Sequence, residues 1–289
     1  MGIIDRKTYI PATILSGLSL IVCTLVCAAI LSCPKTRRRS FNIYLIALLL
    51  PDVMLNLNTF VIRSIELSED KYIQMISFNC CVYLNSLYGY YLFVNMWTSA
   101  AICYEVHQLL LRSHNAIRST PLEPKTVIKR ASIPHFFGIL CVSVRGLILP
   151  QFGFHTGQNS CMGIRTTRTD IAQFIFIGFI MAIPFLYICW ITFDVHWRKL
   201  LPPEGKSRYL ATFFLRTTII CALITVITIL GLSMRAEPSR ILFIFSVSVQ
   251  GLVVSGLSLL KPDLRKAFFS LICCGTKKDK HNPRTTSST

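Results

Sequence analysis

Long apolar stretches alternate with short polar and basic segments along most of the 289-residue chain. A helix needs about 20 consecutive, mostly apolar residues to cross the hydrocarbon core of a bilayer. Seven stretches reach this length, and charged or turn-forming residues separate them. We therefore predict membrane-spanning helices near residues 8–33, 41–62, 78–110, 132–152, 170–197, 210–234 and 240–260.

These stretches leave little chain for any other domain. Residues 1–7 form a short tail, which we expect outside the cell, and residues 8–260 form the bundle. Residues 261–274 predict a short amphipathic helix, and the polar residues 275–289 predict a disordered cytoplasmic tail. The predicted fold class is an all-α membrane protein, a seven-transmembrane helix bundle with a short C-terminal amphipathic helix.

Composition and charge agree with this prediction and orient the bundle. The chain is 53% hydrophobic and 15% charged, whereas soluble domains carry about 25% charged residues. If the loops are numbered alternately from the outside, the cytoplasmic segments hold 20 Lys and Arg and the outer segments hold 8. Cytoplasmic loops collect positive charge, so the N-terminus is outside and the C-terminus inside. Anionic headgroups account for the net charge of +17, and no nucleic-acid partner is expected.

A carboxylate interrupts the second apolar stretch, at Asp52. An acid at the centre of a spanning helix costs about 2.5–3.5 kcal/mol on insertion scales and marks function. Asn42, Leu48 and Asp52 have the spacing found in the second helix of rhodopsin-like G-protein-coupled receptors. In their third helix, a cysteine precedes the acid of an Asp/Glu-Arg-Tyr triplet by 24 residues, as Cys81 precedes Glu105 here. The chain resembles that family at both helices.

The resemblance implies a disulfide at the outer face. In the family, the cysteine that opens the third helix bonds to one in the second outer loop, which implies a Cys81–Cys161 bond. Outer loops face an oxidising compartment, which permits such a bond. Because Cys80 is adjacent, Cys80–Cys161 is the alternative pairing.

The family also ends in an amphipathic helix on the inner leaflet, and residues 261–274 fit it. Pro262 suits a first helical turn, and apolar residues recur at helical spacing at Leu264, Phe268 and Leu271. Many family members are acylated just after this helix, where Cys273 and Cys274 stand. The alternative is a basic juxtamembrane segment with two unmodified thiols.

In the family, the acid at the position of Asp52 binds a sodium ion. Asn95 occupies the matching position on the third span, and Ser255 could approach from the seventh. A carboxylate with amide and hydroxyl ligands suits a hard cation; equally, Asp52 could be a structural carboxyl hydrogen-bonded within the bundle. Pro51 bends the helix and leaves backbone polar groups for neighbouring helices to satisfy.

The chain departs from the family pattern on its first helix, where Thr24 replaces the usual asparagine, and on its third, sixth and seventh spans. The triplet reads Glu105-Val106-His107, so its arginine is missing. The sixth span lacks both the proline and the tryptophan of the family. The seventh span has Val254 to Ser258 where Asn-Pro-x-x-Tyr is expected.

Without the arginine, a cytoplasmic switch would use other charges. We expect Glu105 either to pair with Arg208 or Arg216, at the start of the sixth span, or to be solvated at its helix end.

The outer half of the bundle offers Tyr88, Tyr91 and Arg145 as candidate ligand-pocket residues. Tyr88 stands where amine receptors carry an aspartate, so an amine ligand is disfavoured. Arg145 could pair with an anionic ligand, reach the membrane interface, or pair with a neighbouring helix.

These observations favour a plasma-membrane receptor that passes the signal of a small non-aminergic ligand to heterotrimeric G proteins, with membrane lipids as further partners. An enzyme is not expected, because His107, His135, His155 and His196 do not converge on a metal site. No retinal protein is expected either, since residues 241–260 contain no lysine for a Schiff base. The missing motifs support an alternative: a seven-helix membrane protein not coupled to G proteins, such as a scaffold, trafficking partner or transporter.

Overall fold

The computed structural model of the chain describes residues 6–68, 78–115, 123–148, 167–201, 206–233 and 237–273. Within these ranges every regular element is a helix, so the prediction of an all-helical chain is confirmed there. Seven helices are long: α1 (Arg6–Ser32), α3 (Ser40–Ser68), α4 (Phe78–His114), α5 (Pro124–Ile148), α6 (Thr167–Trp197), α7 (Lys206–Ser233) and α8 (Glu237–Leu259). Each of them overlaps one of the seven predicted stretches.

Two short helices complete the described part, α2 (Pro34–Arg37) and α9 (Pro262–Cys273). The sequence did not predict α2. It begins at a proline after the extended residue Cys33, an arrangement that suits a helix start because proline lacks the backbone N–H. Helix α5 also differs from its prediction: it begins at Pro124, not at residue 132.

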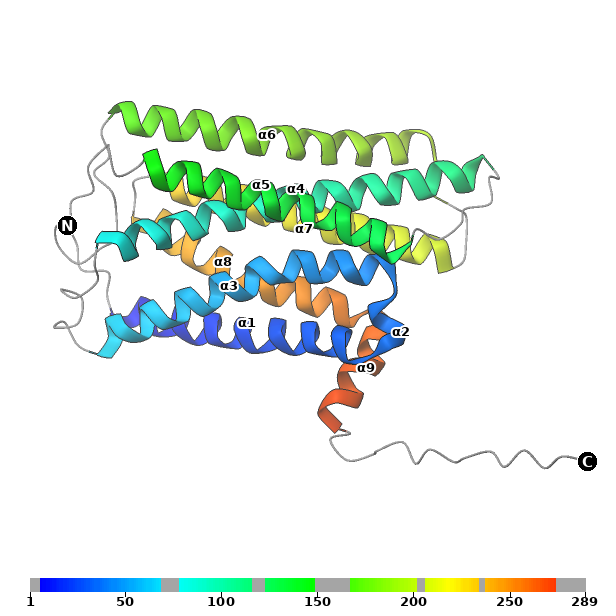
Figure 1. The fold of residues 1–289 in the computed structure, drawn as a ribbon, viewed down its shortest axis with the longest axis horizontal. Coiled ribbons are helices and arrows are strands. Elements are labelled where there is room, and N and C mark those ends of the chain that lie inside the picture. The colour runs from blue at the N-terminus through cyan, green and yellow to red at the C-terminus, as the bar shows by residue number, and fades with distance from the viewer. Residues whose placement is uncertain are drawn as a thin grey trace, which may run out of the picture.

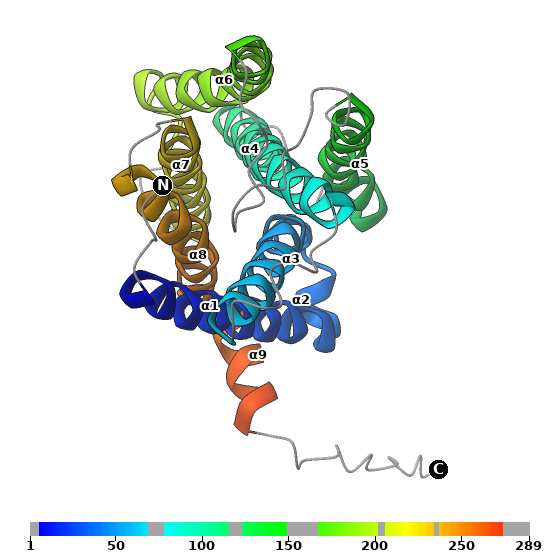
Figure 2. The same cartoon turned by 90° about the vertical axis from the view of Figure 1, so that its left-hand side faces the viewer.

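Figure 1 shows the long helices side by side, with α2 and α9 at the same end of the bundle, here called the α2 end. In the view along the bundle, α1 and α6 lie on opposite sides and α4 lies between them (Figure 2). Helix α4 contacts α3, α5, α6 and α7. It therefore connects α6 and α7 on one side of the bundle to α3 and α5 on the other.

Large apolar side chains lie on the outside of the bundle, and several polar side chains lie inside it. Large apolar residues face outward on α1, α5 and α6, with exposed fractions of 65% for Ile14, 66% for Phe136 and 64% for Leu186. Asp52 and Asn95, by contrast, are fully buried. Outward apolar surface of this extent marks contact with a membrane or a partner.

Among the described residues, two helical stretches are long and apolar enough to cross a membrane, Ile10–Ser32 and Ser40–Val61. Shorter apolar helical stretches occupy Met181–Trp197, Ala211–Ile227 and Ser248–Leu259. The described part of the chain is thus all-helical, with features of an α-helical membrane protein.

Small residues bring α1 and α8 close together. The hydroxyls of Ser16 and Ser248 are 2.8 Å apart across this interface. A Cβ atom added at Gly251 would lie 2.5 Å from Ser19 Oγ and 2.8 Å from Cys23 Sγ. Gly251 therefore sets the distance between the two helices, since any larger residue would have to displace both side chains.

We expect Gly251→Ala to lower the free energy of unfolding by about 1–2 kcal/mol, through overpacking. The matched control is Gly256→Ala on the same helix, where an added Cβ meets nothing within 4 Å. That change should be neutral or stabilising, because alanine is the better helix former. Unfolding by SDS titration in mixed micelles compares the two variants. Equal effects would contradict the close packing at Gly251.

Candidate functional site

A carboxylate and two amides meet at the centre of the bundle. Asp52 on α3 is fully buried, and its Oδ1 accepts a hydrogen bond from Asn95 Nδ2 on α4 at 3.0 Å. Asn56, one turn further along α3, donates from Nδ2 to the Asp52 backbone carbonyl at 2.8 Å. Ser255 instead donates to Cys23 Sγ at 3.3 Å, so its hydroxyl is directed to α1 and the predicted contact with Asp52 is not made.

Three oxygens of this cluster have no hydrogen-bond partner among the described residues: Asp52 Oδ2, Asn95 Oδ1 and Asn56 Oδ1. All three are acceptors, and burying an acceptor without a partner costs free energy. Carboxylate and amide oxygens are the ligands that hard cations prefer, so these residues fit a sodium ion or water molecules.

We expect sodium to stabilise the protein through this cluster. Replacing NaCl by choline chloride at equal ionic strength should lower the thermal midpoint of the wild type by about 2–4 °C, since a ligand that binds only the folded state stabilises it. The Asp52→Asn variant should show no such dependence, and the control Asp194→Asn should retain it. A wild type insensitive to the cation would favour the structural carboxyl.

Pro51 leaves one backbone carbonyl of α3 without its helical hydrogen bond, and a histidine from another helix lies within hydrogen-bond distance of that carbonyl. Because proline has no N–H, the Ala47 carbonyl four residues earlier loses its helical partner. His135 Nε2 on α5 lies 3.0 Å from that oxygen, and His135 Nδ1 lies 2.7 Å from the Tyr90 hydroxyl on α4. With Nε2 as the donor, Nδ1 accepts from Tyr90. His135 therefore connects three helices, α3, α4 and α5.

The candidate ligand-pocket residues are only partly within the described side chains. Tyr91 is 1% exposed, and its hydroxyl donates to Gln250 Oε1 on α8 at 2.7 Å. It packs in the core as a link between α4 and α8. The side chains of Tyr88 and Arg145 lie outside those that the structure describes. Gln250 has no motif around it, and sequence reasoning missed it.

Toward the α2 end, Glu105 on α4 is held by two other helices. Arg130 Nη1 on α5 donates to Glu105 Oε1, and the Tyr44 hydroxyl on α3 donates to the same oxygen at 3.3 Å. The hydrogen bond from Arg130 to Glu105, together with the negative charge of Glu105, raises the pKa of the Arg130 guanidinium. The predicted pairing with Arg208 or Arg216 is not the one observed.

Glu105 is not solvated either, since only 6% of it is exposed. The sequence prediction missed Arg130 because it placed this residue in a loop. Helix α5 begins earlier than expected, which puts Arg130 on the helix and against α4.

A second polar group lies beside the first. His107 Nε2 on α4 is 2.9 Å from Asp194 Oδ2 on α6, and Arg198 Nε donates to Asp194 Oδ1 at 2.7 Å. The Trp190 ring packs edge-on against His107, with ring centroids 5.9 Å apart. The sequence did not single out Asp194, although Asp194 and Arg198 have the i,i+4 spacing of a helical ion pair. Val106, between the two polar residues, is 1% exposed and packs in the core.

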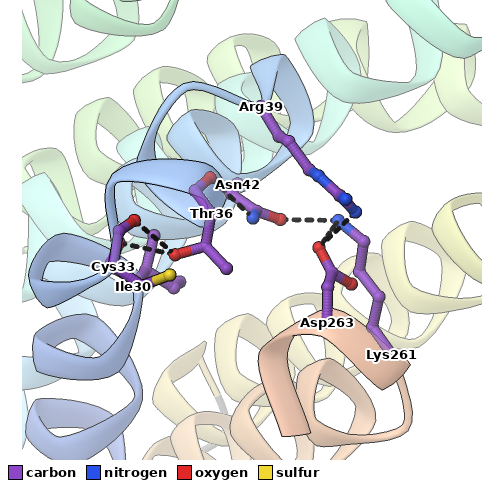
Figure 3. A network of polar contacts seen from close by, with 7 residues as sticks. All are labelled: Ile30, Cys33, Thr36, Arg39, Asn42, Lys261 and Asp263. Atoms are coloured by element: carbon purple, nitrogen blue, oxygen red, sulfur yellow. Dashed lines mark hydrogen bonds and ion pairs between the residues drawn. The ribbon is translucent and has the colours of Figure 1, made fainter. Parts of the chain in front are cut away.

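A third group joins the α2 end to α9 (Figure 3). Asn42 donates from Nδ2 to the Thr36 carbonyl at 2.9 Å, and its Oδ1 accepts from Lys261 Nζ at 2.6 Å. Arg39 Nη1 is 2.7 Å from Asp263 Oδ2, and Lys261 Nζ is 3.6 Å from the same oxygen. Asn42 thus fixes the chain between α8 and α9 to the start of α3.

Helix α9 is amphipathic but uses part of its apolar face differently from the prediction. Leu264 is 1% exposed and Phe268 packs against the bundle core, so these two residues contact protein. Phe269 and Ile272 are the apolar residues that it exposes most. The predicted acylation sites and disulfide fall outside what the structure describes: the side chains of Cys81 and Cys273, and the residues Cys161 and Cys274.

The described residues contain no group of three or more His, Cys, Asp or Glu able to hold a metal ion. Comparisons with known proteins add no assignment. No protein-family model matches the chain, and a search of curated proteins finds no significant match.

Proposed function

We propose that the chain is a seven-transmembrane receptor of the rhodopsin-like kind, which passes the signal of a small non-aminergic ligand to heterotrimeric G proteins. In this proposal the seven long helices span the plasma membrane, with the N-terminus outside and the α2 end in the cytoplasm. Support comes from their overlap with the seven apolar stretches and from the outward apolar residues on α1, α5 and α6.

The observation that carries the proposal is the pair of polar contacts near the α2 end of α4. Glu105 is bonded to Arg130 on α5, and His107 to Asp194 on α6. A receptor needs two helix arrangements whose balance a ligand can shift. Contacts that join one central helix to two neighbours stabilise a closed arrangement, and their rupture would accompany an open one.

One observation favours the second candidate, a seven-helix protein without G-protein coupling. Val106 replaces the arginine that family members turn toward the G protein, and it is buried in the core. Such a protein would keep the bundle and serve as a scaffold, trafficking partner or transporter.

Proximity labelling in the native cell separates the two candidates without a known ligand. The labelling enzyme is fused after Thr289, and the reference is the same fusion on an unrelated plasma-membrane protein. We expect enrichment of G-protein subunits, reduced when the exposed bases Arg112, Lys125 and Lys129 are changed to glutamine. Enrichment of coat, sorting or transport proteins without G-protein subunits would instead support the second candidate.

A further inference from the structure

Basic side chains gather where α2 meets α9. The described side chains of α2, α9 and the residues next to them include six bases and one acid, Asp263. The bases are Arg37, Arg38, Arg39, Lys261, Arg265 and Lys266. So large an excess of positive charge on two short segments creates a strongly positive surface.

The contacts of Asp263 bring these bases together in space. Asp263 Oδ2 lies 2.7 Å from Arg39 Nη1 and 3.6 Å from Lys261 Nζ, so one carboxylate is shared by two cations (Figure 3). Lys261 is 4% exposed, and Asn42 also accepts from it at 2.6 Å. The junction is therefore held by its own internal bonds, and its shape does not depend on a ligand.

Besides Arg39, which is half-exposed and paired with Asp263, four bases lie at the surface of this fixed junction. Arg37 and Arg38 are exposed and lie within two residues of Arg39; Arg265 and Lys266 are exposed and lie within three residues of Asp263. Arginine forks bind phosphate oxygens in pairs, whereas lysine acts as a point charge. Several such groups, each within three residues of the Arg39–Asp263 contact, match a ligand with more than one phosphate.

The surface of α9 next to these bases is apolar, which indicates that the ligand has an apolar part beside its phosphates. Phe269 and Ile272 on α9 are 56% and 53% exposed, beyond the basic residues along the helix. A surface with cations at one end of a helix and apolar side chains at the other fits the boundary between lipid headgroups and acyl chains. A free phosphate compound would use only the cations.

We propose that the junction of α2 and α9 binds the headgroup of a phosphoinositide with two or more ring phosphates, in the inner leaflet. The inference rests on the proposed membrane orientation. It adds a lipid class and a site: the headgroup contacts Arg37, Arg38, Arg265 and Lys266, and the acyl chains pass Phe269. Phosphatidylserine, with one phosphate, engages fewer of these cations.

Native mass spectrometry of the full-length chain, released from detergent, tests this proposal. The probes are dioctanoyl phosphatidylinositol 4,5-bisphosphate and dioctanoyl phosphatidylserine. We expect the bisphosphate to bind at least tenfold more tightly than phosphatidylserine. The variant with Arg37, Arg38, Arg265 and Lys266 changed to glutamine should lose about tenfold or more in bisphosphate affinity.

The matched control removes the same charge elsewhere at this end of the bundle, by changing Arg112, Lys125, Lys129 and Lys199 to glutamine. It should retain binding, and both variants should keep the wild-type thermal midpoint, because all eight side chains are exposed. If both variants lost the same bisphosphate affinity, or if the two lipids bound equally well, binding would depend on net charge alone and the proposed site would be wrong. Whether the chain fractionates with membranes tests its membrane placement separately.

Discussion

Replacing Arg130 with alanine should lower the free energy of unfolding by about 3 kcal/mol, far more than its half-exposed position suggests. The reason lies in its partner. Glu105 is 6% exposed, so among the described residues the variant leaves this buried carboxylate with the Tyr44 hydroxyl as its one remaining donor. Removing one member of an ion pair is costly when the member that remains is the buried one. Lys129→Ala, which removes an exposed charge from the same helix, is the control and should be nearly neutral.

The reverse substitution should be mild. Glu105→Gln keeps an acceptor for Tyr44 and leaves Arg130, whose side chain is 42% exposed, to be solvated. We expect a cost below about 1 kcal/mol. The double variant should then unfold close to Glu105→Gln alone, because no buried charge is left behind. SDS titration of the four proteins measures this asymmetry. If Glu105→Gln were as costly as Arg130→Ala, the explanation by a stranded carboxylate would be wrong.

Replacing His135 with phenylalanine should cost about 2–4 kcal/mol. The ring volume is nearly conserved, but the Ala47 carbonyl and the Tyr90 hydroxyl both lose their partner. Each buried polar group left unpaired costs about 1–3 kcal/mol. Ser143→Ala on the same helix, which removes a hydroxyl bonded to a carbonyl of its own helix, is the control and should have little effect.

Pro51→Ala provides the test of why His135 matters. Alanine at this position restores the backbone N–H that can bond to the Ala47 carbonyl within α3. His135→Phe should therefore cost about 1–2 kcal/mol less in the Pro51→Ala background than in the wild type, a coupling that a double-mutant cycle measures. Additive effects of the two changes would mean that the open carbonyl is not what His135 satisfies.

The amphipathic helix at the C-terminal end illustrates how far the sequence alone reaches. Its location and its helical period could be read from the spacing of Leu264, Phe268 and Leu271. Which of these residues would contact protein and which would face outward could not, since Leu264 and Phe268 pack against the bundle. The helical period of the apolar residues defines an apolar face of the helix. Whether that face contacts protein or lipid depends on how the helix packs against the bundle.

The same division holds for the site. The sequence by itself determined where the long helices lie, apart from the early start of α5, and that Asp52 is costly to bury, because apolar length and polarity are properties of a local stretch. Only the tertiary structure decided which polar side chains would meet. Arg130, Asp194, His135 and Gln250 lie on other helices than the residues they contact, and these contacts depend on the rotation and axial position of each helix. Those quantities are set by the packing of all neighbours at once, as at Gly251, and leave no signature in any single segment.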